Sequence, residues 1–222
     1  MNSALDIKNL SGGYDQTDIV KNITLVLKKG TLTGLIGENG SGKTTFMNTI
    51  YGFTDHRRGE IHLNGENLME KDAEQLQELG IMYGRQEGLI FQSLTVLDHL
   101  SLFSDITGFD DRVKEFIKTF PEIEPLFDKR GGNLSGGERR LVTLAMINLS
   151  ASDFWLLDEP VAGISEERAE RVKAFLLKKL TQGIGILTIE HKMNLFLDSI
   201  DHLFEMREGE MTELNINVTD KG

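Results

Sequence analysis

The stretch GENGSGKTTF occupies residues 37–46 and follows the short apolar run Thr31–Ile36. It fits the pattern G-x-x-x-x-G-K-[ST], in which glycines let backbone N–H groups turn inward around phosphate oxygens. A helix that begins near Lys43 would point the positive end of its dipole at the same phosphates. The Lys43 ammonium would lie near the β- and γ-phosphates, and Thr44 would offer a hydroxyl to Mg²⁺. The stretch predicts a nucleotide-binding loop between a strand and a helix, and leaves kinase, GTPase and ATPase chemistry open.

Length and composition limit the classes of protein to which the chain can belong. The 222 residues suit one or at most two domains, and 39% hydrophobic residues supply a sizeable core. A formal net charge of −11 argues against general binding to nucleic acid or anionic lipid, and the lack of cysteine excludes disulfides and thiolate metal sites. Residues 1–15 lack the apolar region of a signal peptide, and no apolar run approaches the ~20 residues of a membrane span. We therefore expect any membrane spans to belong to another polypeptide.

Apolar segments of strand length alternate along the chain with segments of helical periodicity. Strands are expected at residues 4–10, 23–27, 31–36, 60–63, 80–83, 154–157, 185–189 and 202–206. Helices are expected from about residue 43 and at residues 95–103, 111–120, 136–149, 166–180 and 193–200. The alternation predicts an α/β fold with a mostly parallel sheet, and the continuous apolar runs FWLL and GILTI are typical of strands buried on both faces. The region from about residue 87 to 150 is interpreted as an α-helical insertion.

Two acids, Asp158 and Glu159, follow the apolar run at residues 154–157. The carboxyl ends of strands line the ligand crevice of an α/β sheet, so Asp158 is predicted to reach a phosphate-bound Mg²⁺. Neighbouring residues on a strand point in opposite directions, and Glu159 is therefore assigned to polarising a water for in-line attack on the γ-phosphate. Taken alone, the stretch is equally compatible with two solvated acids at a strand end, and Pro160 favours a turn in either case.

The stretch LSGGE, at residues 134–138, opens a predicted helix with Ser135 as its N-cap. A simple cap and turn is one interpretation, and a second anion-binding helix end is the other. One chain with two such ends and one lysine-bearing loop suggests a site that is completed between two molecules.

In combination these segments resemble the nucleotide-binding subunit of ATP-binding cassette (ABC) proteins over nearly the whole chain. GENGSGKTT resembles the Walker A motif, LSGGE the signature motif, and FWLLDEP the Walker B motif with its catalytic glutamate. Gln86, in MYGRQEGLIF, matches the Q-loop glutamine, with Gln92 as a competing candidate. His191, in LTIEHKM, matches the switch histidine, and Tyr14 matches the aromatic residue that stacks on adenine. On its own, His191 is more often a surface histidine at a strand end, and Tyr14 is more often a core residue. Only their place in the series favours the functional interpretation.

The resemblance implies a single ATPase domain over residues 1–222. Its fold would be that of a P-loop NTPase, with a RecA-like, mostly parallel core, an N-terminal antiparallel β subdomain and the helical insertion. The implied ATP contacts are Tyr14, Gly37, Glu38, Asn39, Gly40, Ser41, Gly42, Lys43, Thr44 and Thr45. The implied contacts to the ATP of a partner subunit are Ser135, Gly136, Gly137 and Glu138. The implied Mg²⁺ site comprises Thr44, Gln86 and Asp158, and the implied catalytic residues are Glu159 and His191.

The resemblance also implies a way of working. Two nucleotide-binding subunits, identical or paralogous, would close head to tail around two ATP molecules and drive separate transmembrane permease subunits. The protein would then be cytoplasmic and peripheral on the inner face of the cell membrane, with no nucleic acid as a partner. A soluble ABC ATPase, for example of the iron–sulfur assembly type, is the alternative. LSGGE and the position of His191 argue against a P-loop kinase or GTPase.

The chain departs from the family pattern at two places. Ile164-Ser165 stands where the family carries Leu-Asp, and Ser165 is expected to cap the next helix instead. FDKRGGN stands where exporter-type members carry Gly-Glu-x-Gly before the signature. The stretches VAGIS, IEHKM and GERR resemble the ATPases of branched-chain amino acid importers and of lipopolysaccharide export, which leaves the cargo and its direction open.

Overall fold

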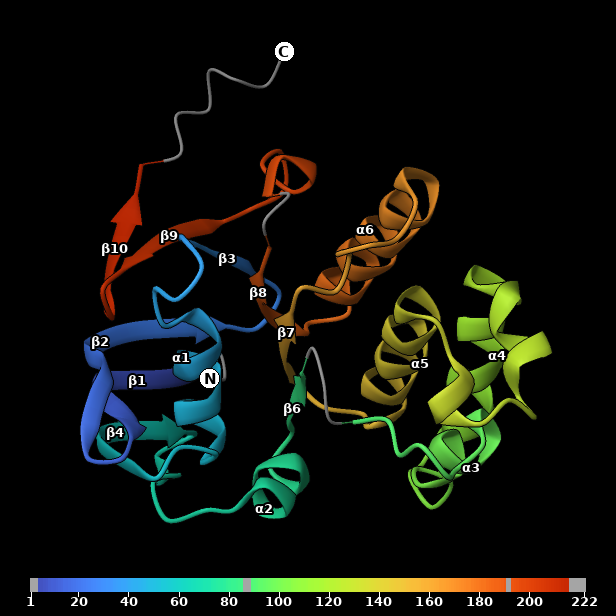
Figure 1. Ribbon diagram of the computed structural model, residues 1–222, viewed down its shortest axis with the longest axis horizontal. Coiled ribbons are helices and arrows are strands. Elements are labelled where there is room, and N and C mark those ends of the chain that lie inside the picture. Colours follow the sequence, from blue (N-terminus) through green and yellow to red (C-terminus); the bar gives the residue numbers. More distant parts are fainter. Residues whose placement is uncertain (1–3, 86–88, 191–192, 216–222) are drawn as a thin grey trace.

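The computed structural model describes residues 4–85, 89–190 and 193–215, which form two sheets with helices packed around them (Figure 1). The strands are β1 (Ala4–Tyr14), β2 (Thr17–Lys28), β3 (Leu32–Ile36), β4 (His56–Leu63), β5 (Glu66–Asn67), β6 (Ile81–Gly84), β7 (Phe154–Asp158), β8 (Gly185–Ile189), β9 (His202–Arg207) and β10 (Glu210–Leu214). The α-helices are α1 (Lys43–Tyr51), α2 (Ala73–Glu78), α3 (Val96–Ser101), α4 (Phe109–Thr119), α5 (Gly136–Leu149) and α6 (Glu166–Thr181). Short 3₁₀ helices are η1 (Pro121–Leu126), η2 (Gly131–Asn133) and η3 (Met193–Leu195).

The larger sheet has the strand order β10-β9-β3-β8-β7-β6 and is parallel except for β10. Ile189, the last residue of β8, pairs with Leu35 of β3 on one side and with Asp158 of β7 on the other. The carboxyl ends of these three strands therefore lie at one level, which is where ligands bind in sheets of this kind. The predicted parallel core is confirmed.

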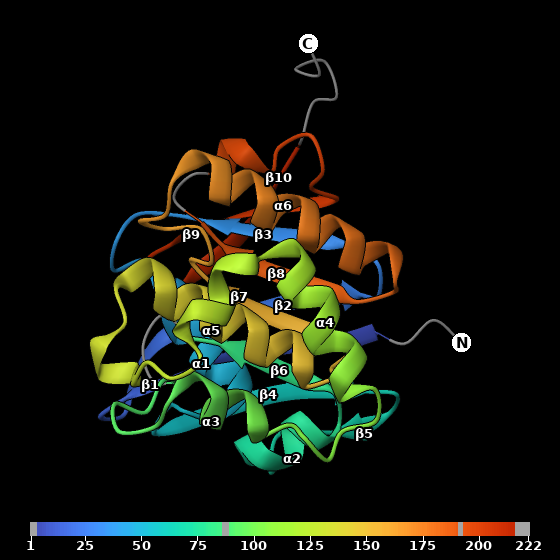
Figure 2. The ribbon, with the colours of Figure 1, turned by 90° about the vertical axis from the view of Figure 1, so that its right-hand side faces the viewer.

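The two faces of the larger sheet are covered by different layers. Figure 1 shows α1 on one side of β6, β7 and β8 and the helices α5 and α6 on the other, and Figure 2 shows this helical side from the front. Trp155 and Leu157 belong to the core shared with α5 and α6, whereas Phe154 and Leu156 pack in the core that contains Phe46 of α1. Because successive strand residues point to opposite faces, a run such as FWLL has to be apolar throughout.

The smaller sheet is antiparallel and has the order β2-β1-β4-β5. In β2 the residues Ile23, Leu25 and Leu27 are buried, and the residues between them are exposed. This alternation is typical of a sheet with one face on a core and one in water. The sheet is the N-terminal antiparallel β subdomain that the family resemblance implies.

Between β6 and β7 the described chain contains α3, α4, η1, η2 and α5. The rings of Phe116 and Phe120 each lie 5.5 Å from the ring of Phe175 on α6, so this helical segment is packed onto the rest of the molecule. Glu122 adds ion pairs to Arg168 and Arg171 of α6, at 3.1 and 2.8 Å. The proposed limits of the helical subdomain, about residues 87 to 150, stay a prediction.

Some local predictions differ from the structure. The helix expected at residues 193–200 is only the short η3 followed by turns, because Phe196 N–H bonds to the Met193 carbonyl at 2.8 Å and Ser199 N–H to the Phe196 carbonyl at 2.9 Å. Met193 and Phe196 are both buried in this 3₁₀-type conformation, so an α-helix is not needed to bring them into the core. Helix α2 and strands β5 and β10 were not predicted from the sequence. Among the residues that the structure describes, no helix combines the length and the apolar character needed to cross a bilayer.

Candidate functional site

The phosphate loop connects β3 to α1, as predicted. Gly37 has a φ of 151°, and a Cβ at this position would collide with the Met206 carbonyl of β9. Gly42, the N-cap of α1, has a φ of 108°, in the left-handed region that favours glycine. Glycine at these two positions lets the loop fold tightly against β9 and enter α1, whose first N–H groups are then available to an anion.

Lys43 is the first residue of α1 and is 8% exposed. Its ammonium donates hydrogen bonds to the carbonyls of Gly37 and Glu38, both at 2.8 Å, so the charge lies across the loop that it belongs to. Burial lowers the pKa of Lys43, and the carboxylates of Glu159 and Asp158 oppose this effect. A phosphate held by the loop would therefore meet a cation that is already positioned beside it.

Thr44 and Asp158 are brought together although 114 positions separate them. The Thr44 hydroxyl donates a hydrogen bond to Oδ2 of Asp158 at 2.9 Å. Asp158 is 4% exposed, and burial raises its pKa, with the charge of Glu159 acting in the same direction. A hydroxyl and a carboxylate at this distance are the oxygen donors that Mg²⁺ uses when phosphates and waters complete its shell.

Within the described ranges, no group of three or more His, Asp or Glu side chains is placed to hold a metal ion. The Thr44–Asp158 pair fits a Mg²⁺ that arrives with a nucleotide. Gln86, the third predicted ligand, lies outside the described residues.

Glu159 lies just beyond the end of β7 in a turn rather than on the strand itself. Its φ is 55°, a left-handed conformation that a residue with a side chain adopts only when its surroundings enforce it. Its N–H donates to the Ile189 carbonyl at 2.9 Å, and its carbonyl accepts from Nε of Arg140 at 3.2 Å. Strand alternation therefore does not apply to Glu159, and the different direction expected for its side chain stays a prediction.

Glu190 follows β8 directly and is 2% exposed. Its Oε1 accepts a hydrogen bond from the N–H of Val161 at 2.8 Å. Burial raises the pKa of Glu190 to about 7, and the charges of Glu159 and Asp158 add to this, whereas Arg140 and the Val161 N–H oppose it. A carboxylate is thus buried within the electrostatic reach of both acids of the candidate site.

Tyr14 ends β1 and is half-buried. Its hydroxyl accepts a hydrogen bond from Nδ2 of Asn48 on α1 at 2.9 Å, which fixes the ring relative to the helix that begins at the phosphate loop. Stacking of this ring on adenine stays a prediction.

Ser135 is the N-cap of α5, as predicted. It forms a capping box: Glu138 N–H donates to Ser135 Oγ at 3.3 Å, and Ser135 N–H donates to Glu138 Oε2 at 2.7 Å. Lys129 holds the same carboxylate at 2.8 Å and lowers the pKa of Glu138. Ser135 and Gly136 are exposed. The side chain of Glu138 thus stabilises the helix end, while the exposed Ser135 and Gly136 can meet a ligand from outside the chain.

The two helix ends that are predicted to bind anions do not meet within one chain. Figure 1 shows α1 and α5 on opposite sides of the strands β6 and β7, and Figure 2 places α5 in front of the sheet and α1 behind it. The structure therefore brings Lys43, Thr44, Asp158 and Glu159 into one site and leaves the signature residues in another place.

Two predicted residues receive no structural description. Gln86 and His191 lie outside the described residues. The competing candidate Gln92 is exposed, and its carbonyl accepts from Gly132 N–H at 3.0 Å. The roles of all three residues stay predictions.

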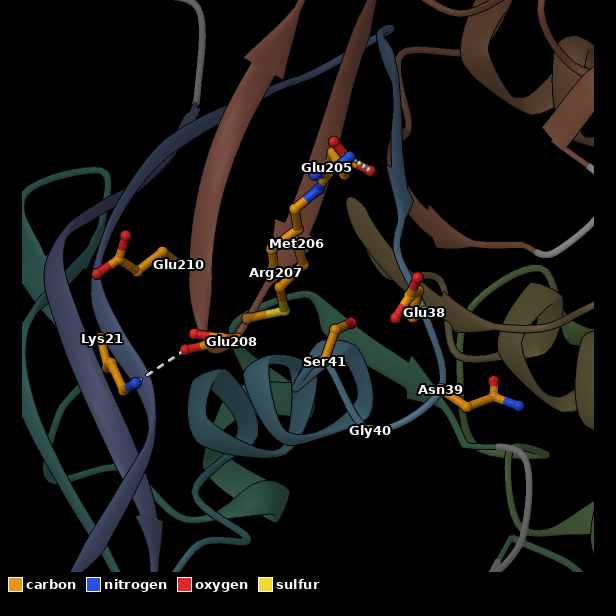
Figure 3. Close-up of a pocket in the computed structure, with 10 residues that line it drawn as sticks. All are labelled: Lys21, Glu38, Asn39, Gly40, Ser41, Glu205, Met206, Arg207, Glu208 and Glu210. Carbon is orange, nitrogen blue, oxygen red and sulfur yellow. Dashed lines mark hydrogen bonds and ion pairs between the residues drawn. The ribbon is translucent and has the colours of Figure 1, made fainter.

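A cavity of about 610 Å³ lies beside the phosphate loop (Figure 3). Its lining comes from the loop, from β2 and from the hairpin between β9 and β10, namely Lys21, Glu38, Asn39, Gly40, Ser41, Glu205, Met206, Arg207, Glu208 and Glu210. Lys21 is held by the Glu208 carbonyl at 2.9 Å, and Arg207 by Glu205 at 2.8 Å. Four carboxylates line this cavity, and its two cations already have partners. The N–H groups and Lys43 at the start of α1 therefore stay the predicted phosphate site.

Arg140 and Glu190 were not identified as site residues from the sequence. The run GILTIE has the same form as FWLLDE, since each is a continuous apolar strand that ends in an acid. This parallel could have indicated Glu190. Arg140 is one of several arginines on α5 and the adjoining loop, and no sequence pattern distinguishes it.

Comparison with known proteins finds one family. A family model described as ABC transporter matches residues 20–162. The probable branched-chain amino acid transport ATP-binding protein LivG of Archaeoglobus fulgidus is 28% identical over 223 residues, which cover 92% of this chain and 86% of the relative. The lipopolysaccharide export system ATP-binding protein LptB of Haemophilus influenzae is 31% identical over 215 residues, which cover 94% of this chain and 89% of the relative. These are the two kinds of ATPase that VAGIS, IEHKM and GERR predicted.

A solved structure shows the same fold. A dimeric ATP-binding cassette in a post-hydrolysis state, bound to ADP and phosphate, has a TM-score of 0.83 with 21% identity. The alignment covers 96% of this chain and 99% of that chain, so the core, the antiparallel sheet and the helical segment all have counterparts.

Proposed function

The chain belongs to the ABC transporter family of ATPases, and we propose that it is the subunit whose ATP hydrolysis drives transport through separate membrane-spanning subunits. The observation that carries this proposal is the 2.9 Å bond between Thr44 and Asp158, which joins the end of the phosphate loop to the end of β7. Lys43 lies in the same site with its ammonium held across the loop. A triphosphate bound at the start of α1 would reach all three side chains.

Each residue of the site has a distinct task. The N–H groups at the start of α1 and the Lys43 ammonium would bind the phosphates, and Thr44 and Asp158 would hold Mg²⁺. When bound, Mg²⁺ supplies positive charge that stabilises the transferring phosphoryl group. Glu159, which follows Asp158 in the turn after β7, would polarise the attacking water. His191 is proposed to hold the γ-phosphate and this water.

The signature residues would complete the site of a second chain. Ser135 and Gly136 are exposed at the start of α5, and α5 lies on the other side of the sheet from α1. A head-to-tail dimer would place this helix end, with its positive dipole, against the phosphates bound by the partner. A solved cassette of the same fold is dimeric, which supports the association of two chains.

A docking surface for a transmembrane subunit is proposed next to the Q-loop position. Three apolar side chains on this part of the chain are strongly exposed: Phe91 (56%), Leu97 (49%) and Leu102 (60%). Just before Gln86 in the sequence, the Arg85 guanidinium lies 4.8 Å from the centre of the Phe53 ring. Exposed apolar groups in the segment that follows the predicted γ-phosphate sensor in the sequence fit a contact that transmits ATP binding to a membrane partner. The protein would then be peripheral on the cytoplasmic face.

The test is the variant Glu159→Gln. It keeps the size of the side chain but removes the carboxylate, so we expect ATP to bind and hydrolysis to fall at least about a hundredfold. Size-exclusion chromatography with ATP and Mg²⁺ should show a dimer for this variant, and a monomer when Ser135→Arg is added. An unchanged turnover number would contradict the role of Glu159.

The transport role needs a separate experiment. The tagged chain is purified from detergent-solubilised membranes and from cytosol, and its partners are identified. Recovery of a multi-span protein supports the proposal. Recovery of soluble partners alone would keep the ATPase and exclude the transport role in favour of a soluble ABC function.

A further inference from the structure

The backbone that carries Glu159 is held from two elements. On one side, Arg140 of α5 donates from Nε to the Glu159 carbonyl at 3.2 Å. On the other side, Ile189 of β8 accepts from Glu159 N–H at 2.9 Å, and Glu190 Oε1 accepts from Val161 N–H at 2.8 Å. The turn between Glu159 and Val161 is thus fixed at both of its ends by groups outside it.

This turn needs such support. A φ of 55° at Glu159 is a conformation of higher energy for a residue with a side chain, and it persists only when the surrounding structure determines it. Pro160 follows, has no N–H and adds no donor to the turn. The Val161 N–H is therefore the next backbone donor after Glu159, and Glu190 is the group that accepts from it.

We infer that Glu190 is a positioning residue for hydrolysis, which together with Arg140 holds the turn that directs Glu159 toward the attacking water. The inference rests on the proposed function, because it assigns Glu159 to that water. In this role Glu190 acts on the turn through Val161 and not on the phosphates. Arg140 lies on the helix that begins with the signature residues. A shift of this helix on contact with a partner's nucleotide would therefore be transmitted through Arg140 to the Glu159 carbonyl of the same chain.

The burial of Glu190 agrees with a specific role. Burying a carboxylate that is 2% exposed and close to two further acids costs free energy, which a purely structural contact would not require. A neutral acceptor of the same length would hold the Val161 N–H as well. The comparison of Glu190→Gln, which keeps the acceptor oxygen, with Glu190→Leu, which removes it, therefore isolates the hydrogen bond.

The experiment measures ATP turnover and nucleotide affinity for both variants, with Glu170→Leu as a matched control on the exposed side of α6. We expect Glu190→Leu to lower kcat at least about tenfold with ATP affinity within about twofold, because displacement of a catalytic group affects the chemical step. Glu190→Gln should recover kcat to within about threefold of the wild type. A kcat for Glu190→Leu equal to that of the control, or a loss in kcat and affinity together that Gln does not rescue, would overturn the inference.

A second measurement does not depend on turnover. The Val161 amide should exchange with solvent slowly in the wild type and in Glu190→Gln, and at least about tenfold faster in Glu190→Leu. Equal exchange in all three proteins would refute the role of Glu190 even if turnover changes. Failure of the proposed function is distinguishable, because it would appear as absent hydrolysis in the wild type and not as a difference between variants.

Discussion

Replacing Glu190 by Gln should change how the stability of the protein depends on pH. Burial, with the charges of Glu159 and Asp158, raises the pKa of Glu190 from its ordinary 4.5 to about 7, and Arg140 opposes this shift. A carboxyl group with a raised pKa binds its proton more tightly in the folded chain than in the unfolded chain. Its contribution is therefore present below pH 4.5 and is lost as the pH rises toward 7.

The size of the effect follows from the two pKa values. A rise from 4.5 to about 7 corresponds to about 3 kcal/mol of stability lost between low and high pH. Gln cannot ionise and does not show this loss. The free energy of unfolding of Glu190→Gln minus that of the wild type should thus increase by about 2 to 3 kcal/mol between pH 5 and pH 8.

The assay is urea unfolding without nucleotide, at several pH values between 5 and 8. Titrating groups that do not interact with Glu190 behave alike in both proteins and cancel in the difference. The exposed residue Glu170 provides the control, since Glu170→Gln should give a difference that is flat with pH. A flat difference for Glu190→Gln as well, or one that decreases with pH, would refute the argument that burial dominates the environment of Glu190.

Two further predictions concern the phosphate loop and the helix ends. Thr44→Ala removes the hydroxyl that lies 2.9 Å from Asp158. Mg²⁺-dependent hydrolysis should therefore fall at least about tenfold, while nucleotide affinity measured in EDTA stays within about threefold. A loss of nucleotide affinity in EDTA as large as the loss of hydrolysis with Mg²⁺ would contradict the metal role. Ser135→Ala removes the N-cap of α5, and Ser165→Ala removes the N-cap of α6. Each substitution should lower the free energy of unfolding, measured by chemical denaturation, by about 1 kcal/mol. A loss below about 0.3 kcal/mol would show that the caps do not stabilise these helices.

Much of the fold could be predicted because the patterns involved are local. The run FWLL is apolar throughout because both faces of β7 are covered, and the cap at Ser135 depends only on residues up to Glu138. The prediction of an α-helix at residues 193–200 was wrong because apolar spacing alone does not distinguish the two kinds of helix. A spacing of three residues buries Met193 and Phe196 in a 3₁₀ turn as well as it would in an α-helix. The hairpin strand β10 was not predicted, because its exposed polar residues show no clear alternation of apolar and polar side chains.

The phosphate-loop motif, the two acids at a strand end and the second glycine-rich helix start could be predicted from sequence, because each is a contiguous pattern with its own chemistry. The hydrogen bonds between Thr44 and Asp158 and between Glu190 and the backbone of Val161 are apparent only in the folded chain. These contacts depend on the register of β3, β7 and β8, which aligns the ends of strands far apart in the chain. The left-handed turn at Glu159 has the same origin, since contacts from β8 and α5 hold it in a conformation that its own residues do not favour.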